Sequence, residues 1–123
     1  MPCEYQIDVP HRLVRARAWG PLSHADFMAT LMGIRNDPAF RSDFSQLYDL
    51  REALPTPISA DKVRDLASYS NFGAGSRRAL VATHDMIYGM LRMYASHRQV
   101  IGQEQIAVFR SLADAQAWLE LKT

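Results

Sequence analysis

The residues with the clearest chemical potential lie mid-chain, where His84 and Asp85 directly follow the apolar run 79–82. A histidine beside an aspartate invites comparison with metal-dependent phosphohydrolases, but those sites need several further converging ligands. The other three histidines, at 11, 24 and 97, have no ligand-like spacing. A single His-Asp pair supplies too few ligands to hold a metal ion. The sequence therefore predicts no metal site, and it places His84 in a loop where it helps the next helix to begin.

A glycine-containing loop, Gly73-Ala74-Gly75, precedes Arg77 and Arg78 and partly matches a phosphate-binding loop. A dinucleotide-binding fingerprint, however, follows a strand and opens a helix, whereas this loop is predicted to follow a helix and open a strand. The third glycine of the fingerprint is also missing. We therefore interpret the loop as the end of a helix, with Gly73 free to adopt a positive φ.

Nucleophilic catalysis has no visible carrier in the sequence. There is no Gly-x-Ser-x-Gly motif, and the single cysteine, Cys3, lies at a terminus that we expect to be frayed. Asp49 and Glu52 could act as acid and base only if they were buried together. Solvated loop carboxylates are the simpler interpretation. We therefore expect a protein that is not an enzyme.

The predicted strand ends give a more useful positional signal, because open parallel sheets bind ligands at the carboxyl ends of their strands. These ends carry Asp49 and Arg51, then Thr83 and His84, then Arg110 and Ser111. Two arginines, a histidine and three helix N-termini could together hold an anionic group. The alternative is ordinary helix capping and surface charge, which occur at such ends in every α/β fold.

The apolar pattern predicts one α/β domain over residues 1–123, with the order β-β-α-β-α-β-α-β-α. Strands are expected at 5–9, 13–19, 46–50, 79–82 and 106–109, and residues 51–58 form an irregular connection. Helices are expected to begin at the N-caps Ser23, Ser59, Asp85 and Ser111. The first two strands form an antiparallel hairpin, and right-handed crossovers make the rest of the five-stranded sheet parallel.

The helix that begins at Asp85 has more apolar surface than one neighbour can cover. Its apolar arc spans roughly 220°, where about 100° is usual for a helix facing a single core. This arc includes Met86, Tyr88, Met90, Met93 and Tyr94. The second neighbour could be another helix of the same chain, a partner chain or an apolar ligand, since methionine adapts to each.

Composition excludes several classes of function. The 123 residues carry a net charge of +1 with acidic and basic residues interspersed, which argues against nucleic acid or a membrane surface as the main partner. A lone cysteine fits a reducing cytoplasm. We find no signal peptide and no run that approaches the roughly 18 apolar residues of a membrane span. We expect a cytoplasmic protein without a cofactor.

Three segments carry a family resemblance: LYDLRE at 47–52, RRALVATHDMIYGMLRMY at 77–94 and IAVFRSLADAQAWL at 106–119. Together they resemble the bacterial SpoIIAA-like domains, relatives of the STAS and Sec14-type folds. The resemblance implies an α/β sheet with helices packed on it, no known enzymatic activity and frequent self-association. Related anti-anti-sigma factors act as phosphorylation switches that use an Asp-Ser pair just after a central strand, at the start of a helix. Here Leu50-Arg51-Glu52 follows Asp49, and the first serine is Ser59, which becomes the candidate phosphosite.

The sequence thus predicts a non-catalytic binding or regulatory domain that acts through protein contacts. We expect a homodimer that uses the Met/Tyr face of the helix after Asp85. The alternatives are a carrier or sensor of a small apolar or anionic ligand, and a phosphorylation-switched module.

Overall fold

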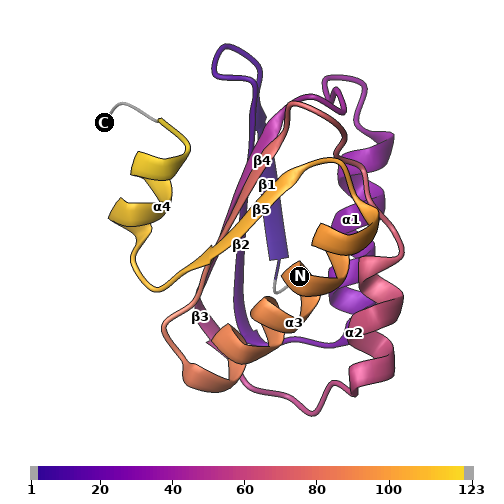
Figure 1. Cartoon of the computed structure of the whole chain (residues 1–123), viewed down its shortest axis with the longest axis vertical. Coiled ribbons are helices and arrows are strands. Elements are labelled where there is room, and N and C mark those ends of the chain that lie inside the picture. The colour runs from indigo at the N-terminus through magenta and orange to yellow at the C-terminus, as the bar shows by residue number, and fades with distance from the viewer. Residues whose placement is uncertain (1–2, 121–123) are drawn as a thin grey trace.

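A computed structural model of the chain describes residues 3–120, and these form one five-stranded sheet with four helices (Figure 1). The strands are β1 (Cys3–Asp8), β2 (Leu13–Pro21), β3 (Ser45–Leu54), β4 (Arg77–Val81) and β5 (Gln105–Phe109). The helices are α1 (His24–Asn36), α2 (Ala60–Ala67), α3 (Asp85–Ile101) and α4 (Leu112–Trp118). The predicted α/β class and the predicted order of elements are confirmed.

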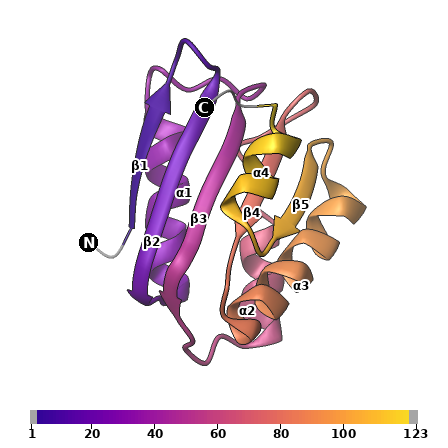
Figure 2. The same ribbon diagram turned by 90° about the vertical axis from the view of Figure 1, so that its left-hand side faces the viewer.

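The strands lie in the sheet in the order in which they occur in the chain, β1-β2-β3-β4-β5 (Figure 2). β1 pairs with β2 in antiparallel fashion, and the other three pairings are parallel, as predicted. Each crossover adds its strand on the same side of the previous one. Right-handed crossovers that always move in one direction place their helices on one face. Accordingly α1, α2 and α3 cover one face of the sheet, and α4 lies on the other (Figure 1).

Helix starts follow the predicted capping residues, with one exception. Ser23 and Asp26 form a reciprocal capping box, and Ser59 and Ser111 cap α2 and α4. At α3, however, the N-cap is His84, whose Nδ1 accepts a hydrogen bond from the backbone N–H of Met86 at 3.2 Å. The prediction that Asp85 caps this helix is therefore wrong by one residue, because the imidazole supplies the acceptor instead.

The third strand is longer than predicted. It continues to Leu54 because its second half pairs with β2, with Glu52 opposite Trp19 and Ala53 opposite Gly20. The irregular connection therefore begins at Pro55 rather than at Arg51. A register shift in β2 between Arg17 and Trp19 accompanies this extension. Because β4 pairs with β3 only as far as Asp49, the far end of β3 projects beyond its neighbour on that side.

Two further expectations need correction. Gly73 does not have the positive φ predicted for it; in that loop Gly75 does, with φ of 87°. Helix α2 has already ended at Ser68, so the loop is a separate turn rather than a helix C-cap. Cys3 is not in a frayed end: it opposes Ala18 in the β1–β2 pairing, and its side chain is buried.

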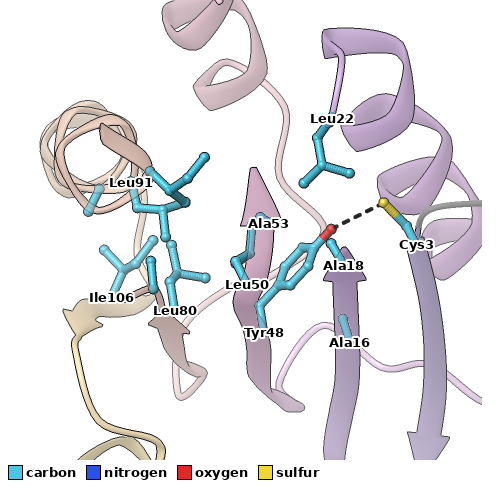
Figure 3. Packing of buried hydrophobic residues seen from close by; sticks show 13 residues of the cluster. Cys3, Ala16, Ala18, Leu22, Tyr48, Leu50, Ala53, Leu80, Leu91 and Ile106 are labelled. Carbon is cyan, nitrogen blue, oxygen red and sulfur yellow. Dashed lines mark hydrogen bonds between the residues drawn. The ribbon is translucent and has the colours of Figure 1, made fainter. Parts of the chain in front are cut away.

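The larger core lies between the sheet and α3, with Phe27 of α1 packed against it. Leu80 and Ile106 of the sheet pack there with Leu91 of α3 (Figure 3). The Tyr48 hydroxyl points along the sheet toward the Cys3 sulfur, 4.0 Å away (Figure 3). On the opposite face a smaller cluster holds Leu47, Ala79, Val81 and Ala115, which fixes α4 over the middle of the sheet. Alternate residues of β4 thus face two different cores, as predicted for a strand covered on both sides.

Candidate functional site

At the predicted site, the strand ends bring acidic and basic side chains together, but each of the two arginines is paired with an aspartate. Arg51 donates from Nε and Nη2 to the two carboxylate oxygens of Asp49, at 2.9 and 2.8 Å. Burial raises the pKa of the Asp49 carboxyl, but the hydrogen bonds from Arg51 outweigh it and leave this pKa lowered. The charge of Arg51 is therefore already balanced. Glu52 does not approach Asp49 as an acid–base partner and instead binds Arg17.

At the end of the neighbouring strand, an arginine is likewise paired with an aspartate. Arg110 donates from Nη1 to Asp85 at 2.6 Å and to the backbone carbonyl of Thr83 at 3.1 Å. Its guanidinium carbon lies 4.0 Å from the centre of the Tyr88 ring, a cation–π contact. The Arg110 hydrogen bond lowers the pKa of Asp85. The Thr83 hydroxyl donates to the backbone carbonyl of Arg51 at 3.3 Å, which links the two pairs.

At the strand ends the sheet meets one of the two conditions for a ligand crevice, because α3 and α4 follow the adjacent strands β4 and β5 on opposite faces. Ligand sites of open α/β sheets form at a switch point, where the strand order reverses and neighbouring helices leave on opposite faces. The order β1-β2-β3-β4-β5 never reverses. With both arginines paired to carboxylates and His84 engaged as a helix cap, these residues can be explained as surface pairing and capping. The predicted anion site therefore remains a prediction.

The apolar face of α3 divides between the inside and the outside of the molecule. Met90 and Tyr94 turn inward and line a cavity next to the sheet. Met86 and Met93 face away, with 66% and 42% of their surface exposed. Tyr88 is half-buried beneath Arg110. The proposed partner surface is therefore narrower than the sequence suggested, because two of its five residues belong to the interior.

The cavity that Met90 and Tyr94 line is enclosed by two strands, three helices and one loop on one face of the sheet. Its floor is formed by β3 and β4, through Gln46, Tyr48, Leu50, Arg78 and Leu80. α1 forms one wall and α3 the other. α2 packs against α1 and α3 rather than on the strands, so that it roofs the space between them. Val63 and Leu66 face inward from this roof, and residues 69–72 of the following loop complete the lining.

The cavity is small and mostly apolar, with a volume of about 80 Å³. That is several times the roughly 10–15 Å³ that one buried water requires, and about half the volume of an engineered 150 Å³ cavity that binds benzene. Ligand sites for larger molecules usually measure about 300–1,000 Å³. In this conformation the cavity suits a compact molecule of a few heavy atoms.

A buried ionic cluster lies at one end of the cavity floor. We call it the buried triad: Arg78, Arg98 and Glu104, which are 6%, 5% and 6% exposed. Arg98 donates to both carboxylate oxygens of Glu104, at 2.9 and 2.8 Å, and Arg78 adds a third hydrogen bond at 3.1 Å. Arg98 also donates to the Ala67 carbonyl at 2.9 Å, at the end of α2. The triad therefore ties the roof helix to α3 and β5.

The environment of Glu104 favours its ionised form. Burial raises the pKa of this carboxyl, but hydrogen bonds from Arg98 and the charges of both arginines outweigh the burial and leave the pKa lowered. Gly102, at the end of α3, makes room for this packing. A Cβ there would collide with the Glu104 carboxylate and the Arg98 guanidinium, although its φ of −93° is accessible to any residue.

Arg78 is the member of the buried triad that also lines the cavity. Its Nε donates to Oε1 of Gln46 at 3.0 Å, and its guanidinium carbon lies 4.8 Å from the Phe72 ring centre and 5.3 Å from that of Tyr94. Its Nη2 takes part in none of the hydrogen bonds among the described residues. The Asn71 side chain also lines the cavity, and its buried Oδ1 has no partner in residues 3–120.

Sequence reasoning missed this site because the fourth strand was expected to begin at Ala79. The strand begins at Arg77 instead. Because side chains two residues apart in a strand share a face, Arg78 then points inward like Leu80. Arg98 likewise continues the buried stripe Leu91–Ala95 of α3 at helical spacing. These two periodicities were the available signals. The pairing with Glu104 depends on β5 lying beside β4 and could not be read from the sequence.

Comparison with protein-family models and with the curated proteins finds no match to this chain. Within residues 3–120 no helix has both the length and the apolar character needed to cross a membrane. Over the same residues no cluster of three or more histidine, cysteine, aspartate or glutamate side chains has a geometry that could hold a metal ion.

Proposed function

We propose that this chain is a non-catalytic domain that binds a compact small molecule in the cavity between the sheet and α2. The observation that carries the proposal is the cavity itself, an apolar space with a few polar groups converging on it. Such a combination is typical of small-molecule sites. Arg78, Asn71 and Gln46 supply the polar groups, and the surrounding lining is aliphatic and aromatic.

The position of α2 supports this proposal. A helix that rests on other helices rather than on the sheet can move outward without breaking strand pairing. Its C-terminal end is held by the hydrogen bond from Arg98 to Ala67, and its N-terminal end follows a connection with two prolines, Pro55 and Pro57. Outward movement of α2 would widen the cavity for entry. Binding and roof position are thereby coupled, which suits a carrier or a sensor.

The test is a titration with neutral compact probes, isopropanol and isobutanol, monitored by the NMR shifts of the backbone amides. We expect shifts at cavity-lining residues of α1, α3 and the 69–72 loop. Leu66→Trp fills the cavity from the roof and should abolish these shifts. Arg64→Trp, on the exposed side of the same helix, is the matched control and should leave them unchanged. Absence of cavity shifts in the wild-type protein would overturn the proposal.

A second candidate function is self-association through the outer side of α3. Met86, Met93 and Val100 follow one another at seven-residue spacing, and Val100 is 83% exposed. Such a stripe on a 17-residue helix can pack against a second copy of itself. Light scattering at low micromolar concentration tests this. A dimer that Met93→Lys converts to a monomer supports it, and a wild-type protein that is strictly monomeric refutes it.

The relationship to SpoIIAA-like domains is proposed from the sequence resemblance and is supported by the order of elements. Ser59 caps α2 through Oγ, which accepts from the Lys62 N–H at 3.2 Å, and the residue is exposed. This capping role accounts for the serine without phosphorylation. A phosphoswitch at Ser59 therefore stays a prediction, which Ser59→Asp would test through oligomeric state and ligand binding.

A further inference from the structure

We propose that the molecule bound in the cavity carries an anionic group, a carboxylate or a close equivalent, which Arg78 receives. This inference rests on the proposed function, since it specifies the ligand class of the same cavity. Three features support it: the net charge of the buried triad, the free hydrogen-bonding positions of Arg78, and the lack of a second carboxylate paired with either arginine among the described residues.

The buried triad contains two guanidinium groups and one carboxylate, so it carries one uncompensated positive charge. A buried ion is costly unless it is paired, and its cost rises as the surroundings become less polar. Glu104 already receives three hydrogen bonds from the two arginines. Among the described residues, no other acidic side chain forms an ion pair with Arg78 or Arg98. The triad therefore leaves an unmet demand for negative charge.

The geometry indicates that Arg78, rather than Arg98, would bind the negatively charged group. Arg98 uses Nε, Nη1 and Nη2 in bonds to Glu104 and Ala67 and does not line the cavity. Arg78 uses Nε and Nη1, and it borders the cavity. Contacts with the Phe72 and Tyr94 rings hold its guanidinium plane in place. A fixed guanidinium with a free edge is suited to a planar carboxylate.

The rest of the lining defines the other part of the ligand. Leu31, Leu80 and Met90 surround the space with apolar atoms, so the body of the molecule must be apolar and compact. The unpartnered Oδ1 of Asn71 accepts hydrogen bonds, and its placement favours a ligand that also has a hydroxyl or N–H group. A short aliphatic carboxylate, straight or branched, combines the required size, charge and apolar surface.

The experiment compares each carboxylate with its uncharged amide in the full-length protein. Backbone amide NMR titrations with isobutyrate and isobutyramide, and with propionate and propionamide, measure both affinity and position. We expect each carboxylate to bind at least about tenfold more tightly than its amide, since hydrogen bonds to charged groups exceed neutral ones by that order. The shifts should centre on Asn71, Phe72 and Tyr94.

Two substitutions at Arg78 then separate charge from packing. Arg78→Gln should remove the preference for carboxylate while amide binding persists, and Arg78→Lys should retain part of the preference. If Arg78→Gln does not fold, the proposal is decided by the affinities of the wild-type protein for the carboxylates and for their amides. Equal affinity for carboxylate and amide would overturn the anionic ligand and leave the cavity function standing. Carboxylate shifts confined to residues 51, 83–85 and 110 would also overturn it, in favour of the strand ends. Binding of neither probe class would overturn both proposals.

Discussion

Two groups of three charged residues, one buried and one exposed, use the same side-chain chemistry in this fold. The buried triad has two arginines around Glu104. On the face of the sheet that carries α4, Arg17 of β2 donates to Glu4 of β1 at 2.9 Å and to Glu52 of β3 at 3.2 Å. We call this second group the surface triad. All three of its side chains are about half exposed or more.

The two triads differ in what surrounds them, and that difference sets their roles. In the surface triad water can solvate whichever charge loses its partner, so each pair contributes little to stability. In the buried triad a lost partner leaves a charge without solvent, which is strongly destabilising. The sign of the net charge also differs: the surface triad is negative and solvated, while the buried triad is positive and borders a cavity. Burial turns a similar arrangement into a candidate binding determinant.

The largest effect is expected from removal of the carboxylate at the centre of the buried triad. Glu104→Gln leaves two adjacent buried guanidiniums without a counter-charge and should lower the free energy of unfolding by about 3–5 kcal/mol. Urea denaturation followed by circular dichroism measures this. Arg78→Gln leaves the neutral Arg98–Glu104 pair intact and should cost less.

Glu52→Gln is the matched control, because it removes one carboxylate from the surface triad. Its effect should be several-fold smaller than that of Glu104→Gln, since solvent replaces the lost partner. Equal destabilisation by the two substitutions would mean that burial does not distinguish the triads.

A smaller but still clear effect is expected at Gly102. Gly102→Ala forces the Glu104 carboxylate and the Arg98 guanidinium apart, and should cost about 1–3 kcal/mol, the usual range for overpacking. Gly89→Ala, within the exposed part of the same helix, meets no atom within 4 Å. Because alanine favours the helix, it should stabilise by about 0.5–1 kcal/mol. Thermal denaturation should therefore shift in opposite directions, and a shared direction would contradict the packing at Gly102.

Acid should weaken the buried triad in a way that Glu104→Gln removes. The folded-state pKa of Glu104 lies below its usual value of about 4.3. Its stabilising contribution is therefore complete above that value and is lost as the pH falls through the lower folded-state pKa. Unfolding free energies measured from pH 6 to pH 3 should fall more steeply in wild type than in Glu104→Gln. Parallel curves would show that Glu104 does not stabilise the fold as a carboxylate.

Local sequence patterns were sufficient to predict the architecture and insufficient to predict the cavity. Ser23, Ser59 and Ser111 cap helices as expected because a capping bond needs only residues three positions apart. The sequential strand order and the lifted position of α2 depend on packing between distant segments. Those two features create the cavity, so no motif in the chain could have indicated it.

The sequence draws attention to charged residues that lie close to one another in the chain, such as Asp49 and Arg51. The structure pairs these two with each other. Arg78 lies one residue before the strand that the sequence predicts at 79–82, so the sequence pattern does not predict that its side chain points inward. The wide apolar arc of α3 is divided in the structure: Met90 and Tyr94 line the cavity, whereas Met86 and Met93 stay exposed. Whether a partner covers the exposed part stays a prediction.

The smallest effect is expected in the surface triad, and its salt dependence should set it apart from the buried one. Arg17→Gln removes both surface pairs and the contact of Arg17 with the Trp19 ring, whose centre lies 4.6 Å from the guanidinium carbon. Salt screens solvated ion pairs. Raising it from 0.05 to 0.5 M should therefore remove the part of the Arg17→Gln effect that comes from the two ion pairs, and leave only the part that comes from the Trp19 contact. The same change in salt should leave the deficit of Glu104→Gln almost intact, because ions do not enter the buried triad. Denaturation midpoints of the two variants at both salt concentrations test this directly. A Glu104→Gln deficit that disappears with salt would mean that solvent reaches the buried triad, and the uncompensated charge on Arg78 would then no longer argue for an anionic ligand.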